Sequence, residues 1–191
     1  MLFSGGIEKE ILVWKKSTKK SGLFFLFQKL KGHMTTINCI KMIPGCDMIS
    51  SGSCDESVII WGWASKTDKK LSNLQHLKGL SSQITALDFD GNEKRLFAGG
   101  TDNKISIWQF KNRTGKFKLY DYYEGHSDQI STLSFCKKRN ILFSGSFDSQ
   151  IFLWKNSPEG VFVQVSSVQA HSDIINCVFY EDSLNMLFSG S

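Results

Sequence analysis

Proline is scarce in this chain, and long apolar runs are absent from it. Only Pro44 and Pro158 occur, and no stretch has the composition of a disordered tail. The longest apolar run, residues 23–27, is far shorter than the roughly 20 residues that cross a membrane. No basic stretch precedes an apolar core at the start of the sequence. We therefore expect a globular protein with no membrane span and no secretion signal.

The five cysteines are odd in number and form no C-x-x-C pair. This spacing favours neither a zinc site nor a disulfide framework. Cys39 and Cys177 each follow an asparagine in a strand-like apolar segment, which is typical of a small buried hydrophobe. We predict an intracellular, cytoplasmic protein without a bound metal or cofactor.

Catalytic motifs are also missing. The sequence contains neither a phosphate-binding loop nor a G-x-S-x-G nucleophile elbow. Asp88 and Asp90 would share one face of a strand, but no second carboxylate pair accompanies them. His76 stands alone near a strand end and is typical of a surface residue.

What the sequence does contain is an internal repeat. Tryptophans recur 47, 47 and 46 residues apart, at Trp14, Trp61, Trp108 and Trp154. The segments that lead to them align without gaps: SGGIEKEILVW, SGSCDESVIIW, AGGTDNKISIW and SGSFDSQIFLW. A second aligned block reads GHMTTINCIKM, GLSSQITALDF, GHSDQISTLSF and AHSDIINCVFY. A period of this length predicts a repeat architecture.

Each repeat is expected to form four short strands. In the second repeat the β-prone segments are residues 36–43, 47–51, 58–61 and 71–77. No segment of about ten residues or more shows a convincing helical period, so the chain is predicted to be all-β. Four strands in a unit of this size are the blade of a β-propeller.

The repeated Gly-His, Ser-Gly-Ser, turn Asp and Trp positions resemble the WD-repeat family over essentially the whole chain. The resemblance implies an open arc of about four blades, each of four antiparallel strands. The expected blade segments within residues 1–191 are about 1–30, 31–78, 79–123, 124–168 and 169–191. The sequence departs from the family pattern in three ways: no Asp follows any of the four tryptophans, Leu80 and Ala98 replace His and Ser in the third repeat, and Glu8 replaces the turn Asp in the first.

Residues 2–6 and 187–191 occupy the same point of the repeat. A closed ring of four blades would therefore hold two copies of one strand. We expect the chain to be part of a longer propeller, and to self-associate or aggregate when it is expressed alone.

The resemblance also implies a buried hydrogen-bonded set of His, Ser, Asp and Trp in each complete blade. By position the two sets are His33, Ser51, Asp55 and Trp61, and His126, Ser144, Asp148 and Trp154. Ser, His and Asp also make up a catalytic triad. A nucleophile occurs once per site, however, whereas this set recurs with the same spacing and with a tryptophan that acyl transfer does not need. We therefore predict a structural role and no enzymatic activity.

In the family, partners often dock on the face that carries the turn Asp residues. The corresponding positions here are Thr36, Asn38, Cys54, Gln83, Thr85, Thr101, Gln129, Ser131 and Phe147. Phe147 is the one aromatic among them and is a candidate binding hot spot, unless it packs within its own turn.

Basic residues are expected to gather on the opposite face. They are Lys15, Lys16, Lys19, Lys20, Lys66, Lys69, Lys70, Lys111, Arg113, Lys116, Lys137, Lys138 and Arg139. They are either solvated loop residues or an attractive surface for an acidic partner. We predict a scaffold that binds other proteins; the alternative is a binder of nucleic acid or another anionic surface through this basic face.

Overall fold

The computed structural model describes residues 1–17, 22–63, 70–78, 80–169 and 171–191, and these residues form seventeen β-strands and no helix. The all-β class predicted from the sequence is confirmed. The strands belong to five antiparallel sheets, which we call blades 1 to 5.

Blade 1 contains β1 (Leu2–Gly5), β2 (Glu10–Lys16) and β3 (Phe24–Lys31). Blade 2 contains β4 (Ile37–Ile43), β5 (Met48–Ser53), β6 (Val58–Trp63) and β7 (Leu71–Leu77). Blade 3 contains β8 (Ile84–Asp90), β9 (Arg95–Gly100), β10 (Ile105–Lys111) and β11 (Lys116–Tyr123). Blade 4 contains β12 (Ile130–Cys136), β13 (Ile141–Ser146), β14 (Gln150–Asn156) and β15 (Phe162–Gln169). Blade 5 contains β16 (Cys177–Glu181) and β17 (Met186–Gly190).

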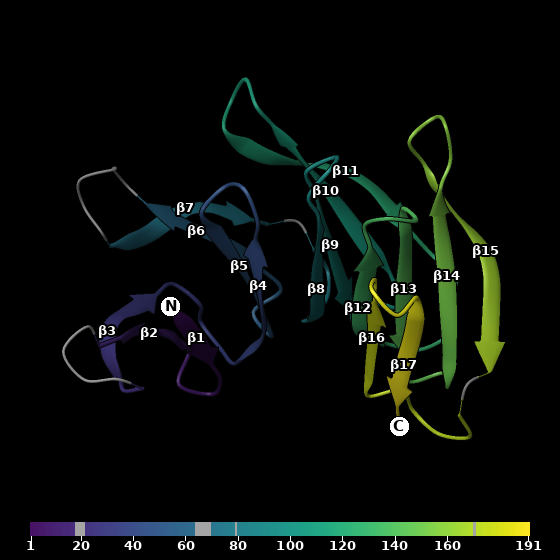
Figure 1. Cartoon of the computed structure of the whole chain (residues 1–191), viewed down its shortest axis with the longest axis horizontal. Coiled ribbons are helices and arrows are strands. Elements are labelled where there is room, and N and C mark those ends of the chain that lie inside the picture. Colours follow the sequence, from purple (N-terminus) through teal and green to yellow (C-terminus); the bar gives the residue numbers. More distant parts are fainter. Residues whose placement is uncertain (18–21, 64–69, 79, 170) are drawn as a thin grey trace.

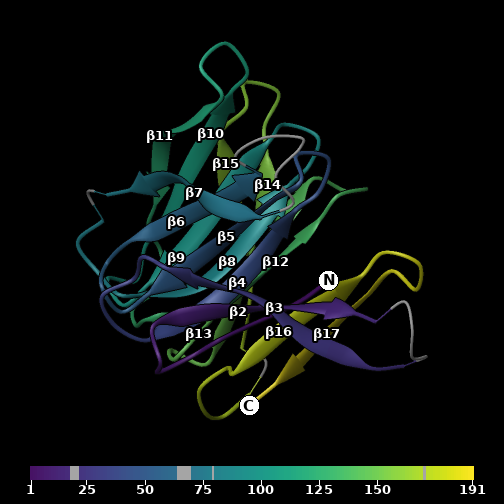
Figure 2. The same ribbon diagram turned by 90° about the vertical axis from the view of Figure 1, so that its left-hand side faces the viewer.

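The blades follow one another along an open arc (Figure 1). Within each blade the strands pair in chain order, and no blade closes into a barrel. The first strands of consecutive blades, β4, β8, β12 and β16, contact one another in that order. Figure 2 shows the same chain turned by a quarter turn, with the blades behind one another. The last strands, β3, β7, β11 and β15, lie on the outer rim. The arrangement is that of an incomplete β-propeller, as predicted.

The hydrophobic core lies between blades rather than within them. One cluster joins blades 1 and 2, and further clusters join blades 2 and 3, 3 and 4, and 4 and 5. Because a blade inside the arc is covered on both faces, β5 and β9 are buried along their whole length. This explains why the strand segments read as nearly continuous apolar and small residues rather than as a clean alternation.

One sequence expectation about burial is wrong. Cys177 was expected to be a buried hydrophobe like Cys39, but it is exposed, whereas Cys39 is half-buried. Cys177 lies on β16, in a sheet of only two described strands, so less of the sheet is covered than in blades 2 to 4. All five cysteines lie in the described part of the chain and are free thiols.

Inner strands are linked across blades by bulge residues. Asn38, Thr85 and Ser131 are each the extra residue of a register shift in β4, β8 and β12. The Asn38 amide donates to the carbonyl oxygen of Ile84 in the next blade at 2.8 Å. The hydroxyls of Thr85 and Ser131 donate in the same way to the carbonyl oxygens of Ile130 and Ile175. A small polar residue at this repeat position therefore joins each blade to the next.

Outer strands are linked by glutamines. The Gln28 side chain donates to the Leu71 carbonyl oxygen at 2.6 Å and accepts from the Leu71 N–H at 2.9 Å. Gln75 makes the same pair of bonds with Phe117, at 2.7 and 2.8 Å. An amide can do this because it carries a donor and an acceptor side by side. Together with the bulge residues, these bonds hold the blades in the relative positions that create the candidate site.

Candidate functional site

In blade 2 the four predicted network residues form a continuous hydrogen-bonded chain. The Trp61 indole N–H donates to the Ser51 hydroxyl oxygen at 2.8 Å. That hydroxyl donates to His33 Nε2 at 2.7 Å, and His33 Nδ1–H donates to the Asp55 carboxylate at 3.0 Å. Ser51 is fully buried and the His33 side chain is inaccessible to solvent. Every polar hydrogen along this chain therefore has an acceptor.

Blade 4 repeats the arrangement almost unchanged. Trp154 Nε1 donates to the Ser144 hydroxyl at 2.8 Å, and Ser144 donates to His126 Nε2 at 2.7 Å. His126 Nδ1–H donates to the Asp148 carboxylate at 2.8 Å. The imidazole also stacks on the Phe152 ring, with 3.9 Å between the ring centroids. The same residue types at the same spacing thus produce the same local geometry in two separate blades.

Burial sets the charge state of the histidines. It lowers the pKa of His33 and of His126, although the hydrogen bond from each ring to its aspartate opposes the shift. Burial works against ionisation of Asp55, but hydrogen bonds from the Ser57 hydroxyl, the Met34 N–H and His33 keep the pKa of this carboxyl below its ordinary value. Each set therefore contains a neutral imidazole that donates to a carboxylate.

The other blades lack the complete set. In blade 3, Leu80 and Ala98 replace the histidine and the serine, and Trp108 Nε1 is buried with no hydrogen-bond partner among the described residues. Asp102 accepts from the Lys104 N–H of its own turn at 3.3 Å. In blade 1, Trp14 donates to Ser4 at 3.0 Å, and in blade 5, His171 and Ser189 lie 2.9 Å apart.

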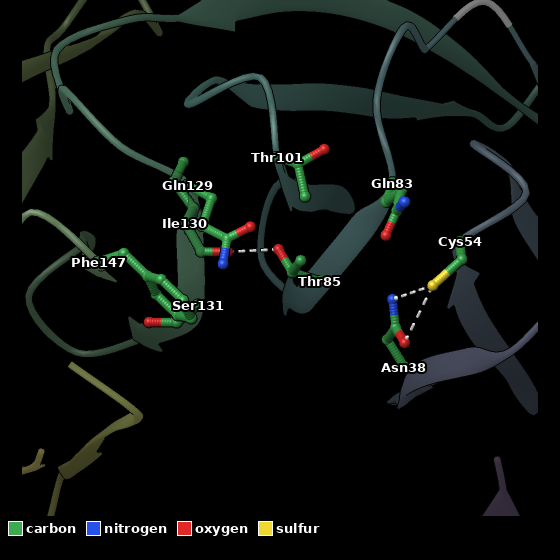
Figure 3. Close-up of a pocket in the computed structure, with 9 residues that line it drawn as sticks. All are labelled: Asn38, Cys54, Gln83, Thr85, Thr101, Gln129, Ile130, Ser131 and Phe147. Atoms are coloured by element: carbon green, nitrogen blue, oxygen red, sulfur yellow. Dashed lines mark hydrogen bonds between the residues drawn. The ribbon is translucent and has the colours of Figure 1, made fainter. Parts of the chain in front are cut away.

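The predicted partner-binding residues line a hollow at the inner ends of blades 2, 3 and 4. The hollow encloses about 320 Å³. Its lining residues, drawn in Figure 3, are Asn38, Cys54, Gln83, Thr85, Thr101, Gln129, Ile130, Ser131 and Phe147. Thr36 is not among them, and its carbonyl oxygen accepts from the Cys54 N–H at 3.0 Å. Ile130 was missed, because an apolar strand residue gives no sign in the sequence that it borders a hollow.

The lining residues differ in whether their side chains already bond to a neighbouring blade or are exposed to a partner. Asn38, Thr85 and Ser131 already donate to the neighbouring blade, so their main role is to hold the walls of the hollow together. Gln83 and Thr101, in contrast, are exposed on its middle wall.

Phe147 and Gln129 form the blade 4 wall, and both are half-buried. The Phe147 N–H donates to the Gln129 carbonyl oxygen at 3.0 Å, which ties the aromatic residue to the start of β12. The hollow therefore combines one partly exposed aromatic ring with neutral polar groups.

The predicted basic residues are only partly described. Lys19, Lys20, Lys66 and Lys69 lie outside the described residues. Lys16, Lys137, Lys138 and Arg139 are exposed, as are Lys70, Lys111, Arg113 and Lys116. Lys15 is half-buried, with its ammonium 5.2 Å from the centre of the Phe27 ring. Lys138 donates to the Asp182 carbonyl oxygen at 3.1 Å, which joins the β12–β13 and β16–β17 turns.

In the described part of the chain, no helix is long and apolar enough to cross a membrane. No group of three or more His, Cys, Asp or Glu side chains is placed to hold a metal ion among these residues.

A comparison with protein-family models found one description, WD domain, G-beta repeat, at residues 25–62, 71–109 and 117–155. Each matched range begins in the outer strand of one blade and ends in the third strand of the next. Together the ranges cover more than half of the chain. No curated protein matches the sequence significantly.

Proposed function

The chain belongs to the WD domain, G-beta repeat family, and we propose that it is a non-enzymatic scaffold that captures partner proteins in the hollow beside Phe147. WD repeats are a protein-interaction kind of domain, which supports the general role. The observation that carries the location is the hollow itself, since residues from three blades converge on it.

Phe147 is the best candidate for a binding anchor. A partly exposed aromatic ring at the edge of a hollow can bury apolar area without a large loss of side-chain freedom. The backbone bond to Gln129 holds the turn in place before any partner arrives. Such preorganisation lowers the entropic cost of association.

The burial of the two serines argues against hydrolysis by the Ser–His–Asp sets. A nucleophile must come within about 3 Å of a substrate carbonyl carbon. Ser51 and Ser144 are fully buried, and each hydroxyl already accepts from a tryptophan and lies against a histidine. We assign these sets the role of bracing the turns that carry Cys54 and Phe147.

The test combines Phe147→Asp with Gln129→Ala in one variant and replaces Lys15, Lys16, Lys19 and Lys20 by Glu in another. We expect the first variant to lose partner capture in a pull-down. Its thermal unfolding should be unchanged, because both altered side chains are only partly buried. The lysine variant should retain its partners. A pull-down in which only the lysine variant loses them would refute the proposal.

A second candidate function is recognition of an anionic surface, and the exposed basic residues Lys16, Lys137, Lys138 and Arg139 favour it. In that case the lysine reversals would abolish binding and Phe147→Asp would have no effect. Raising the salt concentration would then reproduce the lysine reversals, since contacts to several phosphates weaken steeply with salt.

A further inference from the structure

The face that contains the hollow is acidic, although the whole chain carries a net charge of +5. We call it the turn-Asp face and define it by turns 6–9, 54–57, 101–104 and 147–149 and by residues 32–36, 78, 80–83, 124–129 and 171–176 of the loops. Its acidic residues are Glu8, Asp55, Glu56, Asp102, Glu124, Asp128, Asp148 and Asp173. Its lysines are Lys9, Lys78 and Lys104. The acidic residues on this face therefore clearly outnumber the lysines.

Some of these acidic residues are sequence neighbours of residues that line the hollow. Asp55 and Asp148 are turned toward their histidines. Asp102 and Asp128 adjoin the lining residues Thr101 and Gln129 on neighbouring blades. Asp102 is half-buried and Asp128 is exposed, so both can be reached from solvent.

Backbone hydrogen bonds orient both carboxylates. Asp102 Oδ1 accepts from the Lys104 N–H at 3.3 Å, and Asp128 Oδ1 accepts from the Gln129 N–H at 2.6 Å. Neither bond uses the second oxygen, Oδ2. Lys104, two residues after Asp102, pairs with Glu124 at 2.6 Å and interacts more weakly with the Asp102 charge. None of the residues that line the hollow is a lysine or an arginine.

We propose that the hollow receives a basic segment of a partner protein, which places an apolar side chain against Phe147 and a lysine or arginine between Asp102 and Asp128. This inference rests on the proposed function, because it names the chemistry of the partner at the same site. Charge complementarity selects the partner: an acidic peptide or a nucleic acid would meet like charge here. The neutral oxygens of Gln83 and Thr101 supply additional acceptors for a cationic donor.

The experiment pans an unbiased phage library of short peptides against the full chain and measures the affinity of the enriched peptides. Three variants are compared with the wild type. Phe147→Asp tests the site, and Asp102→Asn with Asp128→Asn tests the charge while keeping an acceptor oxygen for each turn. Glu93→Gln with Glu159→Gln is the matched control, since both glutamates are exposed and lie in loops on the opposite face.

We expect the enriched peptides to carry net positive charge next to an apolar residue, and to lose binding to Phe147→Asp. The double Asn variant should bind them about tenfold more weakly at low salt, and the difference should shrink as salt is added. The control variant should bind like the wild type. Neutral or acidic peptides that still depend on Phe147 would overturn the charge inference and leave the proposed function standing.

Two other outcomes would overturn the proposal. Peptides that bind all variants equally would overturn both the site and the inference. The second outcome is self-association at low salt, measured by sedimentation, that is lost both in the double Asn variant and on reversal of Lys137, Lys138 and Arg139. That result would identify the occupant as the basic face of a second copy and refute the partner-peptide proposal.

Discussion

The serine hydroxyl in each buried set accepts one hydrogen bond and donates another, so a single atom joins an indole to an imidazole. Blade 3 lacks this atom because Ala98 stands in its place, and the Trp108 indole N–H is left without a partner among the described residues. Leu80 fills the histidine position with buried apolar surface. At this position blade 3 is stabilised by apolar packing alone, whereas blades 2 and 4 also have the hydrogen-bonded set.

The first prediction compares the three turn aspartates. Asp55→Ala and Asp148→Ala should each lower the free energy of unfolding by about 1–3 kcal/mol, because each removes the carboxylate that accepts from a buried imidazole N–H and from a backbone N–H. Asp102→Ala should cost less, since it removes only a long bond within its own turn. Urea denaturation of the three variants measures the difference. Equal losses at all three positions would contradict the assigned networks.

The second prediction concerns acid stability. The pKa values of His33 and His126 lie below 6.5 in the folded protein, so the unfolded chain binds more protons once the pH falls below about 6.5. Their contribution to stability is present above that pH and is lost below it. The pKa values of Asp55 and Asp148 lie below 3.8, so their contribution is lost only below about pH 4.

The free energy of unfolding should therefore fall in two stages on acidification, which denaturation midpoints between about pH 7.5 and about pH 3 can resolve. His126→Gln removes one titrating ring and should make the first stage shallower. A first stage that is equally steep in this variant would show that His126 does not cause it.

At the scale of whole elements, every outer strand contains a bulge at the same repeat position. Phe27, Leu74, Tyr120 and Val165 are skipped in the pairing of β3, β7, β11 and β15 with their neighbours. A bulge twists the free edge of a sheet and so discourages pairing with another chain. All four are apolar or aromatic residues, which are common throughout the strands, so no sequence pattern distinguished the bulge positions.

Glycines in the second strands determine how closely blades approach. A Cβ on Gly145 would lie 2.7 Å from Ile175 Cγ2 in the next blade and 2.8 Å from Thr132 Cγ2. Gly145→Ala should therefore destabilise the protein by about 1–3 kcal/mol through overpacking. Gly91→Ala is the control, because no heavy atom lies within 4 Å of its added Cβ. Thermal unfolding compares the two, and a neutral Gly145→Ala would show that the interface can widen.

At the scale of the whole molecule, consecutive blades contact one another directly, and the buried sets of blades 2 and 4 are separated by blade 3. Stability in such a chain approximates a sum of blade terms and nearest-neighbour terms. The combined Asp55→Ala and Asp148→Ala variant should therefore lose the sum of the two single losses, to within about 0.5 kcal/mol. A double-mutant cycle in urea measures this. A larger deviation would show coupling through blade 3.

The sequence by itself determined the repeat, the all-β class, the four-strand unit and the candidate residues, because spacing along the chain is preserved when each unit folds locally. Only the tertiary structure decided how units meet. The side chains of the bulge residues Asn38, Thr85 and Ser131 bond to the next blade. Gln28 and Gln75 bond to the next outer strand, and Ile130 lines the hollow. These contacts depend on strand register and blade separation, which arise only when neighbouring repeats pack and which no single repeat encodes.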